Sequence, residues 1–186
     1  LGNPNLKQAG IDFEFTKEQV TEYLKCSKDP VYFIKKYIRI VSLDEGLVPF
    51  DMYDFQEDLV NTIHDNRFVI AKLPRQTGKS TTIISYLLHY VLFNQSMSVA
   101  VLANKQSVAR DILSRLQLAY EYLPLWLQQG ILEWNKGSIH LENGSKIIAS
   151  STSSSAIRGG SYNTIFLDEF AHIPNNIAEE FFSSVY

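Results

Sequence analysis

The stretch FVIAKLPRQTGKS, residues 68–80, decides the fold of this chain. Its apolar first half predicts a β-strand, and its second half is a turn that ends in Gly-Lys-Ser and leads into a helical pattern. Loops of this kind bind di- and triphosphates, because their backbone N–H groups and the positive end of the following helix surround the phosphates. The general motif has glycine at the position of Leu73. Gly-Lys-Ser alone would also fit an ordinary helix start that carries a lysine.

A second motif lies downstream, where an apolar and β-prone run at residues 164–167 ends in Asp168 and Glu169. Neighbouring residues at the end of a strand point in different directions, so Asp168 can hold Mg²⁺ while Glu169 polarises a water molecule. The plainer alternative is a buried strand that meets an acidic helix start. Because the two motifs occur in the order that nucleotide hydrolysis needs, together they favour a nucleoside triphosphate site.

Composition limits the class of protein. A chain of 186 residues with 45% hydrophobic and 20% charged residues fits one globular, soluble domain. Its net charge of −3 argues against a surface that coats nucleic acid, although a local basic patch remains open. No apolar run approaches the roughly 20 residues that span a bilayer, so we expect a soluble, cytoplasmic protein. The single cysteine, Cys26, has no partner for an internal disulfide and is interpreted as structural.

The order of predicted elements is that of an α/β fold. Residues 1–12 resemble an arm or linker, and helices are predicted from Thr16 with Gln19, from Pro30, and over residues 54–64. The strand at 68–72, the helix at 81–93 and a buried strand at 97–103 predict a βαβ unit with a parallel sheet.

The segment after this unit is predicted to add a long helix and an antiparallel insert. An amphipathic helix runs from Val108 to the stop at Pro124, and its Lys105, Arg110 and Arg115 are interpreted as a solvated face that could also contact DNA or another subunit. Residues 131–149 then alternate with a period of two around Lys-Gly and Asn-Gly turns, which predicts β-hairpins.

Further motifs accompany the Gly-Lys-Ser loop and the acidic strand end. They are DPVYFI at residues 29–34, the arginine at position 75 ahead of Gly-Lys, WNKGSI at 134–139 and IRG at 157–159. Together with LDE at 167–169, they make most of the chain resemble the ATPase domain of the large terminase of tailed bacteriophages, the DNA-packaging motor, and especially its T4-like group. The resemblance implies a P-loop NTPase fold of the RecA/ASCE type, with helices flanking the sheet, a β-hairpin insert and an N-terminal helical segment.

The resemblance also implies roles for individual residues, with ATP and Mg²⁺ as ligands. Ser80 and Asp168 would hold the metal, Lys79 would reach the β- and γ-phosphates, and Glu169 would orient the attacking water. Gln56 matches a glutamine that recognises adenine, which favours ATP over GTP. The nucleotide-binding set is Gln56, Pro74, Arg75, Gln76, Thr77, Gly78, Lys79, Ser80 and Thr81.

Two arginines compete to stabilise charge on the transferred phosphate. Arg75 lies inside the loop and can act in cis, whereas Arg158 precedes the acidic strand and would be given to a neighbouring subunit in a ring. An ordinary surface arginine remains the alternative for each.

The resemblance predicts a division of the chain into an N-terminal arm and helical segment, residues 1–50, and a P-loop core, residues 51–186. The core looks truncated before the coupling motif and the nuclease domain of the family. The implied partners are double-stranded DNA, the portal protein, the small terminase subunit and further copies in a ring, in the cytoplasm of an infected host and transiently at the procapsid.

The sequence leaves two further interpretations open. One is a truncated nucleotide-binding module without turnover, and the other is a helicase-like P-loop ATPase. Glu169 and the two arginines favour hydrolysis, whereas the missing carboxy-terminal portion favours the module without turnover.

Overall fold

The N-terminal third of the chain is helical with one small hairpin. The computed structural model describes residues 3–42, 44–152, 160–170, 175, 176, 179 and 183. The first elements are α1 (Lys17–Lys28), α2 (Pro30–Tyr37), β1 (Arg39–Ser42), β2 (Gly46–Pro49) and α3 (Asp54–Asp65). Strands β1 and β2 pair antiparallel as a separate two-stranded sheet. The sequence pattern did not predict this hairpin, because its two strands are only four residues long.

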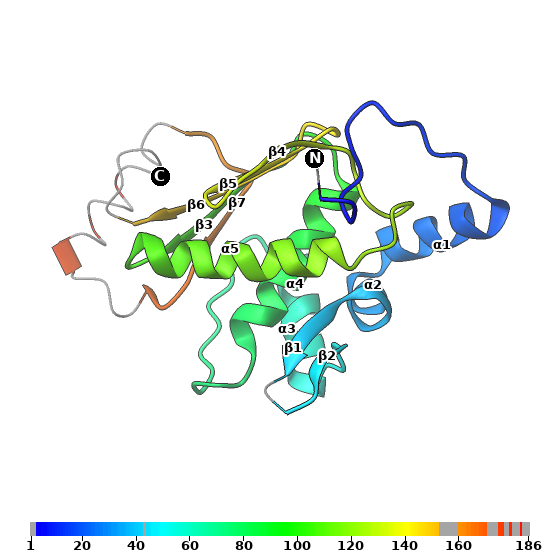
Figure 1. Cartoon of the computed structure of the whole chain (residues 1–186). Helices are drawn as coiled ribbons and strands as arrows, with labels where there is room; N and C mark the ends of the chain where they lie inside the picture. Colours follow the sequence, from blue (N-terminus) through cyan, green and yellow to red (C-terminus); the bar gives the residue numbers. More distant parts are fainter. Residues whose placement is uncertain are drawn as a thin grey trace.

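The remainder of the chain builds the main sheet and its helices (Figure 1). These elements are α4 (Lys79–Phe93), β3 (Ser98–Ala103), α5 (Gln106–Glu121), β4 (Ile131–Trp134), β5 (Ser138–Leu141), β6 (Lys146–Ser151) and β7 (Thr164–Leu167). The five strands have the order β4-β5-β6-β3-β7. Strands β6, β3 and β7 are parallel, whereas β4 and β5 are antiparallel to their neighbours. The fold is therefore α/β with a mixed sheet, and the predicted antiparallel hairpins are confirmed.

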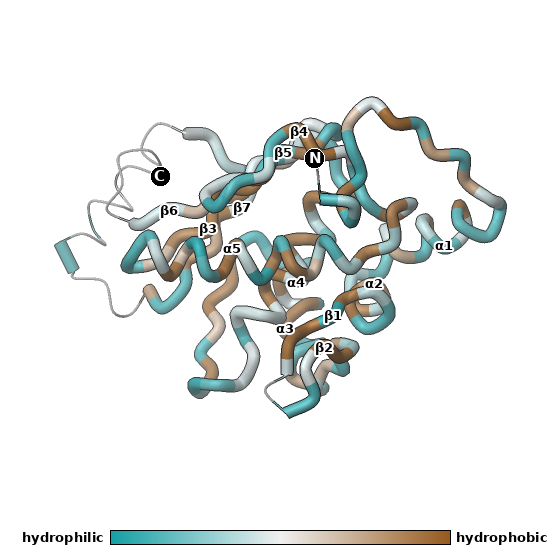
Figure 2. The backbone as a smooth tube through the Cα atoms, in the orientation of Figure 1, coloured by the Kyte–Doolittle hydropathy of each residue, from teal (hydrophilic) through white to brown (hydrophobic). Residues whose placement is uncertain are grey.

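The core lies mainly between this sheet and the helices. Strand β3 is buried along its whole length, and its residues alternate between the two faces of the sheet. Val99 and Val101 belong to the large cluster that also contains the apolar residues of α4 and α5. Ala100 and Leu102 face a smaller cluster with residues such as Ile165 on the other side. Figure 2 shows hydrophobic colouring along β3 and α4 at the centre of the molecule.

The N-terminal helices follow the capping signals in the sequence. Thr16 and Gln19 form the predicted capping box of α1, and Asp29 caps α2 through the N–H of Tyr32. Glu22 of α1 then joins the two helices, because its carboxylate accepts hydrogen bonds from Lys36 and from the hydroxyls of two tyrosines of α2. The hydrogen bond from Lys36 is the main reason why the pKa of Glu22 falls to about 2.

The predicted strand at residues 68–72 is wrong. The segment has no strand structure, and Ile70 is 97% exposed. A strand forms only where a neighbouring strand accepts and donates its backbone hydrogen bonds. In the part of the chain that the structure describes, β7 ends the sheet and pairs only with β3, so no strand lies beside residues 68–72. The predicted βαβ unit therefore lacks its first strand.

The N-terminal arm is docked on the sheet. The Ile131 N–H donates to the carbonyl of Lys7, next to a bridge between Gln8 and Ile131. The buried side chain of Gln128 accepts from the Lys7 N–H and donates to the carbonyl of Asn5. These bonds connect the start of the chain to the edge of β4 (Figure 1).

Candidate functional site

The loop at residues 74–80 ends at Gly78, which is the N-cap of α4. Gly78 has a φ of +73°, in the left-handed region, and a Cβ atom there would lie 2.7 Å from Nε2 of Gln56. Both facts restrict the position to glycine. Because glycine has no side chain to cap the helix, the first N–H groups of α4 have no side-chain acceptor at the N-cap.

The start of α4 carries a positive charge and no acidic residue. Helices α1 and α3 carry acidic residues in their first turn, as the helix dipole favours, whereas α4, like α2 and α5, carries none, and α4 begins with Lys79. A cation at the positive end of a helix is unfavourable unless an anion lies beside it. The N-terminus of α4 is therefore a candidate anion site.

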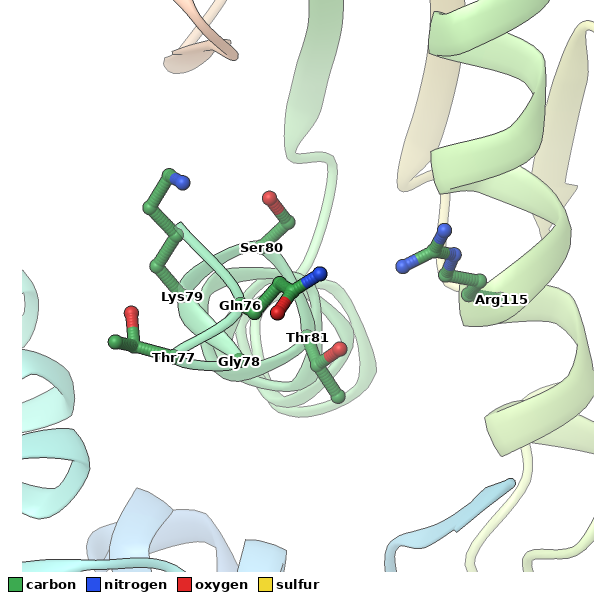
Figure 3. A pocket seen from close by; sticks show the side chains of 7 residues that line it. All are labelled: Gln76, Thr77, Gly78, Lys79, Ser80, Thr81 and Arg115. Atoms are coloured by element: carbon green, nitrogen blue, oxygen red, sulfur yellow. The ribbon is translucent and has the colours of Figure 1, made fainter. Parts of the chain in front are cut away.

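A cavity of about 160 Å³ lies over this helix start. It is lined by Gln76, Thr77, Gly78, Lys79, Ser80, Thr81 and Arg115. Figure 3 shows Arg115 reaching from the neighbouring helix towards the loop, while Lys79 extends on the opposite side. Six of the predicted nucleotide-binding residues therefore lie together, and Arg115 joins them although its sequence position indicated only a solvated helix face.

The acidic strand end is connected to the loop. The Ser80 hydroxyl donates a hydrogen bond of 3.1 Å to Oδ1 of Asp168, and the Asp168 N–H donates to the carbonyl of Leu102 on β3. Two residues predicted to share a metal ion therefore lie side by side, although 88 positions separate them. A hydroxyl and a carboxylate are oxygen donors of the type that Mg²⁺ prefers, so this pair fits the ion.

Protein ligands alone do not enclose a metal in this region. Among the described residues there is no group of three or more His, Cys, Asp or Glu side chains that could hold an ion. Mg²⁺ commonly takes only one or two protein ligands and completes its coordination with water and phosphate oxygens. The Ser80 and Asp168 pair is therefore suited to a metal that arrives with a phosphate ligand.

A second cavity, of about 590 Å³, adjoins the loop. The β1–β2 hairpin and the start of α3 form its outer wall, and Gln76, Thr77, Gly78 and Thr81 line both cavities. Tyr53 lines this cavity and is 69% exposed, with its ring stacked on that of Phe55 at 5.8 Å between centroids. Its size and its aromatic wall suit a flat organic group next to the anion site.

Gln56 lies between the larger cavity and the loop. Its side chain is 3% exposed, and both ends of its amide are bonded within the protein. Oε1 accepts from the Tyr53 N–H at 3.0 Å, and Nε2 donates to the carbonyl of Thr77 at 3.0 Å. In this structure, Gln56 therefore fixes the conformation of the loop.

Of the other predicted residues, Pro74, Arg75 and Glu169 do not line either cavity. Pro74 and Arg75 are exposed, and the Pro74 carbonyl accepts a hydrogen bond from the Thr77 hydroxyl. Glu169 is exposed directly after β7 and has a φ of +51°, a left-handed conformation that is uncommon for glutamate. Arg158 lies outside the described residues.

The fold and the site define a class of protein, a mixed α/β domain with a candidate anion site at a helix N-terminus. The chain belongs to the family of the terminase large subunit, T4-like virus type, N-terminal, whose model matches residues 70–184. The structure is also similar to the large terminase of bacteriophage HK97, with a TM-score of 0.69 and 17% sequence identity over 85% of this chain. The match covers 34% of the HK97 protein, so this chain spans about a third of that protein's length.

None of the helices in the described ranges is long and apolar enough to cross a membrane.

Proposed function

We propose that this chain is the ATP-hydrolysing part of a phage large terminase, with a P-loop NTPase core of the RecA/ASCE type. The main support for the proposal is the cavity over the start of α4. Lys79, Ser80 and the loop backbone line this cavity, and Ser80 is hydrogen-bonded to Asp168. Family membership supports a role in phage DNA packaging, and the proposal is that this role is the translocation of double-stranded DNA into a procapsid.

In this proposal the residues of the loop bind and orient the phosphates. The N–H groups at the start of α4 and the ammonium group of Lys79 neutralise their charge. Ser80 and Asp168 hold Mg²⁺, which would withdraw charge from the phosphate oxygens when bound. Glu169 accepts a hydrogen bond from the attacking water, and its position one residue after Asp168 supports this role.

The larger cavity would take the adenine base and the ribose. Gln56 borders this cavity, and the Tyr53 ring offers a surface for stacking. The amide of Gln56 can make four hydrogen bonds and makes two within the protein, so recognition of adenine would use its second N–H and the second lone pair of Oε1.

Arg75 and Arg158 remain the proposed charge-stabilising arginines. Arg75 would act in cis from the loop, and Arg158 would act on a neighbouring copy in a ring. As partners we propose DNA, the portal protein and the small terminase subunit, in the cytoplasm of the infected host and transiently at the procapsid.

The test is phosphate release from Mg²⁺-ATP, measured across a range of protein concentrations. We expect turnover that rises more than linearly with protein concentration, because the second arginine arrives from another copy. Lys79→Ala should lose binding and turnover, whereas Glu169→Ala should lose turnover and keep ATP affinity.

Two other outcomes of this test would lead to different conclusions. Binding without phosphate release above the Glu169→Ala control would favour the second candidate, a nucleotide-binding module without turnover. Binding and turnover that persist in Lys79→Ala would place the nucleotide elsewhere and overturn the proposal.

A further inference from the structure

Arg115 closes the cavity over the loop from a different helix. In the described part of the chain, the other lining residues all belong to residues 76–81, and Arg115 comes from α5. Figure 3 shows the guanidinium group directed at the loop from the side opposite Lys79. An anion on the N-terminus of α4 would therefore lie between two cations that approach it from different elements.

The present partner of Arg115 is weakly held. Its Nη2 lies 2.7 Å from Oδ2 of Asp111, one helical turn earlier, and both side chains are more than half exposed. Exposed pairs with this spacing contribute little to stability, because water and salt screen them. Asp111 does not line the cavity. Its carboxylate therefore holds the guanidinium group from outside the site, and an anion inside it can replace that carboxylate at little cost.

A guanidinium group binds a phosphate group better than it binds the single carboxylate of Asp111. A guanidinium group offers parallel N–H donors that match two phosphate oxygens, and its charge is permanent. Hydrogen bonds between such charged groups are the strong ones in proteins. We infer that Arg115 contacts the phosphate chain of the bound nucleotide, and that it exchanges Asp111 for phosphate when the ligand enters. This inference rests on the proposed nucleotide site.

The chain offers a matched control for this residue. Arg110 lies on the same helix and is exposed, but it does not line either cavity. Both Arg115→Ala and Arg110→Ala remove one positive charge from α5. We expect Arg115→Ala to weaken binding about tenfold, as the loss of one charged hydrogen bond implies, and Arg110→Ala to change it less than about twofold. Arg115→Lys should give an intermediate value, because it keeps the charge and loses the paired donors.

Asp111 provides a change in the opposite direction. Asp111→Asn removes the competing carboxylate without altering the size of the side chain. We expect anion binding to become about twofold tighter, because an exposed ion pair of this spacing competes with the anion by about that factor. In a protein that also carries Arg115→Ala, Asp111→Asn should leave the affinity for the anion unchanged, apart from the small effect of removing one negative charge from the surface.

The experiment is a calorimetric titration of the folded variants with tripolyphosphate and, separately, with Mg²⁺-ATP. Tripolyphosphate carries the phosphate chain without a base, so its dependence on Arg115 tests the inference whether or not ATP is hydrolysed. Equal affinities of Arg115→Ala and Arg110→Ala, with Lys79→Ala defective, would overturn the inference and leave the proposed function standing. If tripolyphosphate binding depends on Arg115 but Mg²⁺-ATP neither binds nor turns over, the proposed function fails instead. Absence of binding of either ligand overturns both.

Discussion

Gln56 holds the loop of the candidate site in place, which its position in the sequence did not indicate. It is buried, and its amide bridges the backbone of Tyr53 and the backbone of Thr77. Its Nε2 atom also occupies the space where a side chain at Gly78 would have to go. The conformation of the loop therefore depends on a residue from α3, a different element, and the pairing of these two segments sets where the helix start points.

Replacing Gln56 with leucine should destabilise the protein. Leucine has a similar volume but leaves the Tyr53 N–H and the Thr77 carbonyl without their partner, which costs about 1–3 kcal/mol. Gln106→Leu is the control, because Gln106 is exposed at the start of α5 and should change stability by less than about 0.5 kcal/mol. The free energy of unfolding in urea measures both. Equal values for the two variants would contradict a role of Gln56 in fixing the loop.

At the scale of elements, strand pairing decides where sequence and structure agree. The helices with capping signals, such as α1 and α2, begin at the residues that the sequence predicts. The apolar strands β3 and β7 are also as predicted, because both pair within the sheet. Residues 68–72 have a similar apolar composition but no neighbouring strand among the described residues, and pairing is a property of the whole sheet that local composition does not contain.

The exposure of Ile70 makes a direct prediction. Ile70→Ala should change the free energy of unfolding of this chain by less than about 0.5 kcal/mol, because its side chain is 97% exposed. In a core strand the same change would cost about 2–5 kcal/mol. Val101→Ala in the buried strand β3 is the reference for a core position. A loss at Ile70 as large as that at Val101 would show that residues 68–72 are packed in solution.

The sequence indicated the motif residues of the candidate site, but not the residue that tertiary packing adds to them. The order of motifs predicted that residues 76–81 and Asp168 belong together, and the cavity and the Ser80 bond agree with this grouping. Arg115 was missed because it lies on an exposed helix face, where a charged residue has no sequence signal that distinguishes solvent from a ligand. Only the packing of α5 beside α4 brings it to the loop.

At the scale of the whole molecule, His89 joins the N-terminal helices to the central helix. It is a buried residue of α4, and its Nε2–H donates to the carbonyl of Cys26 on α1 at 2.9 Å. The aromatic rings of Phe33 and Phe93 lie beside it. Burial lowers the pKa of His89 to about 4, because the charged imidazolium loses its water of hydration.

This lowered pKa predicts that acid destabilises the fold. An unfolded histidine takes up a proton near pH 6.5, whereas folded His89 does so only near pH 4. The stabilising contribution is therefore fully present above pH 6.5 and is lost as the pH falls towards 4, with about 2 kcal/mol lost between pH 7.5 and 5. Urea unfolding at several pH values measures it.

A variant without the buried imidazole isolates this contribution. His89→Leu should lose about 2 kcal/mol less than the wild type between pH 7.5 and 5, whatever its stability at neutral pH. An unchanged pH dependence in His89→Leu would rule out His89 as the source.

The docked N-terminal arm limits how copies of this sheet can add to one another. A backbone group that is already bonded cannot accept a strand from a second molecule, and the arm occupies such a position at Ile131, the first residue of β4. Within the described residues, β7 is the strand at the other end of the sheet. The arm therefore protects the start of the β4 edge, and loss of the arm should make self-association through that edge easier.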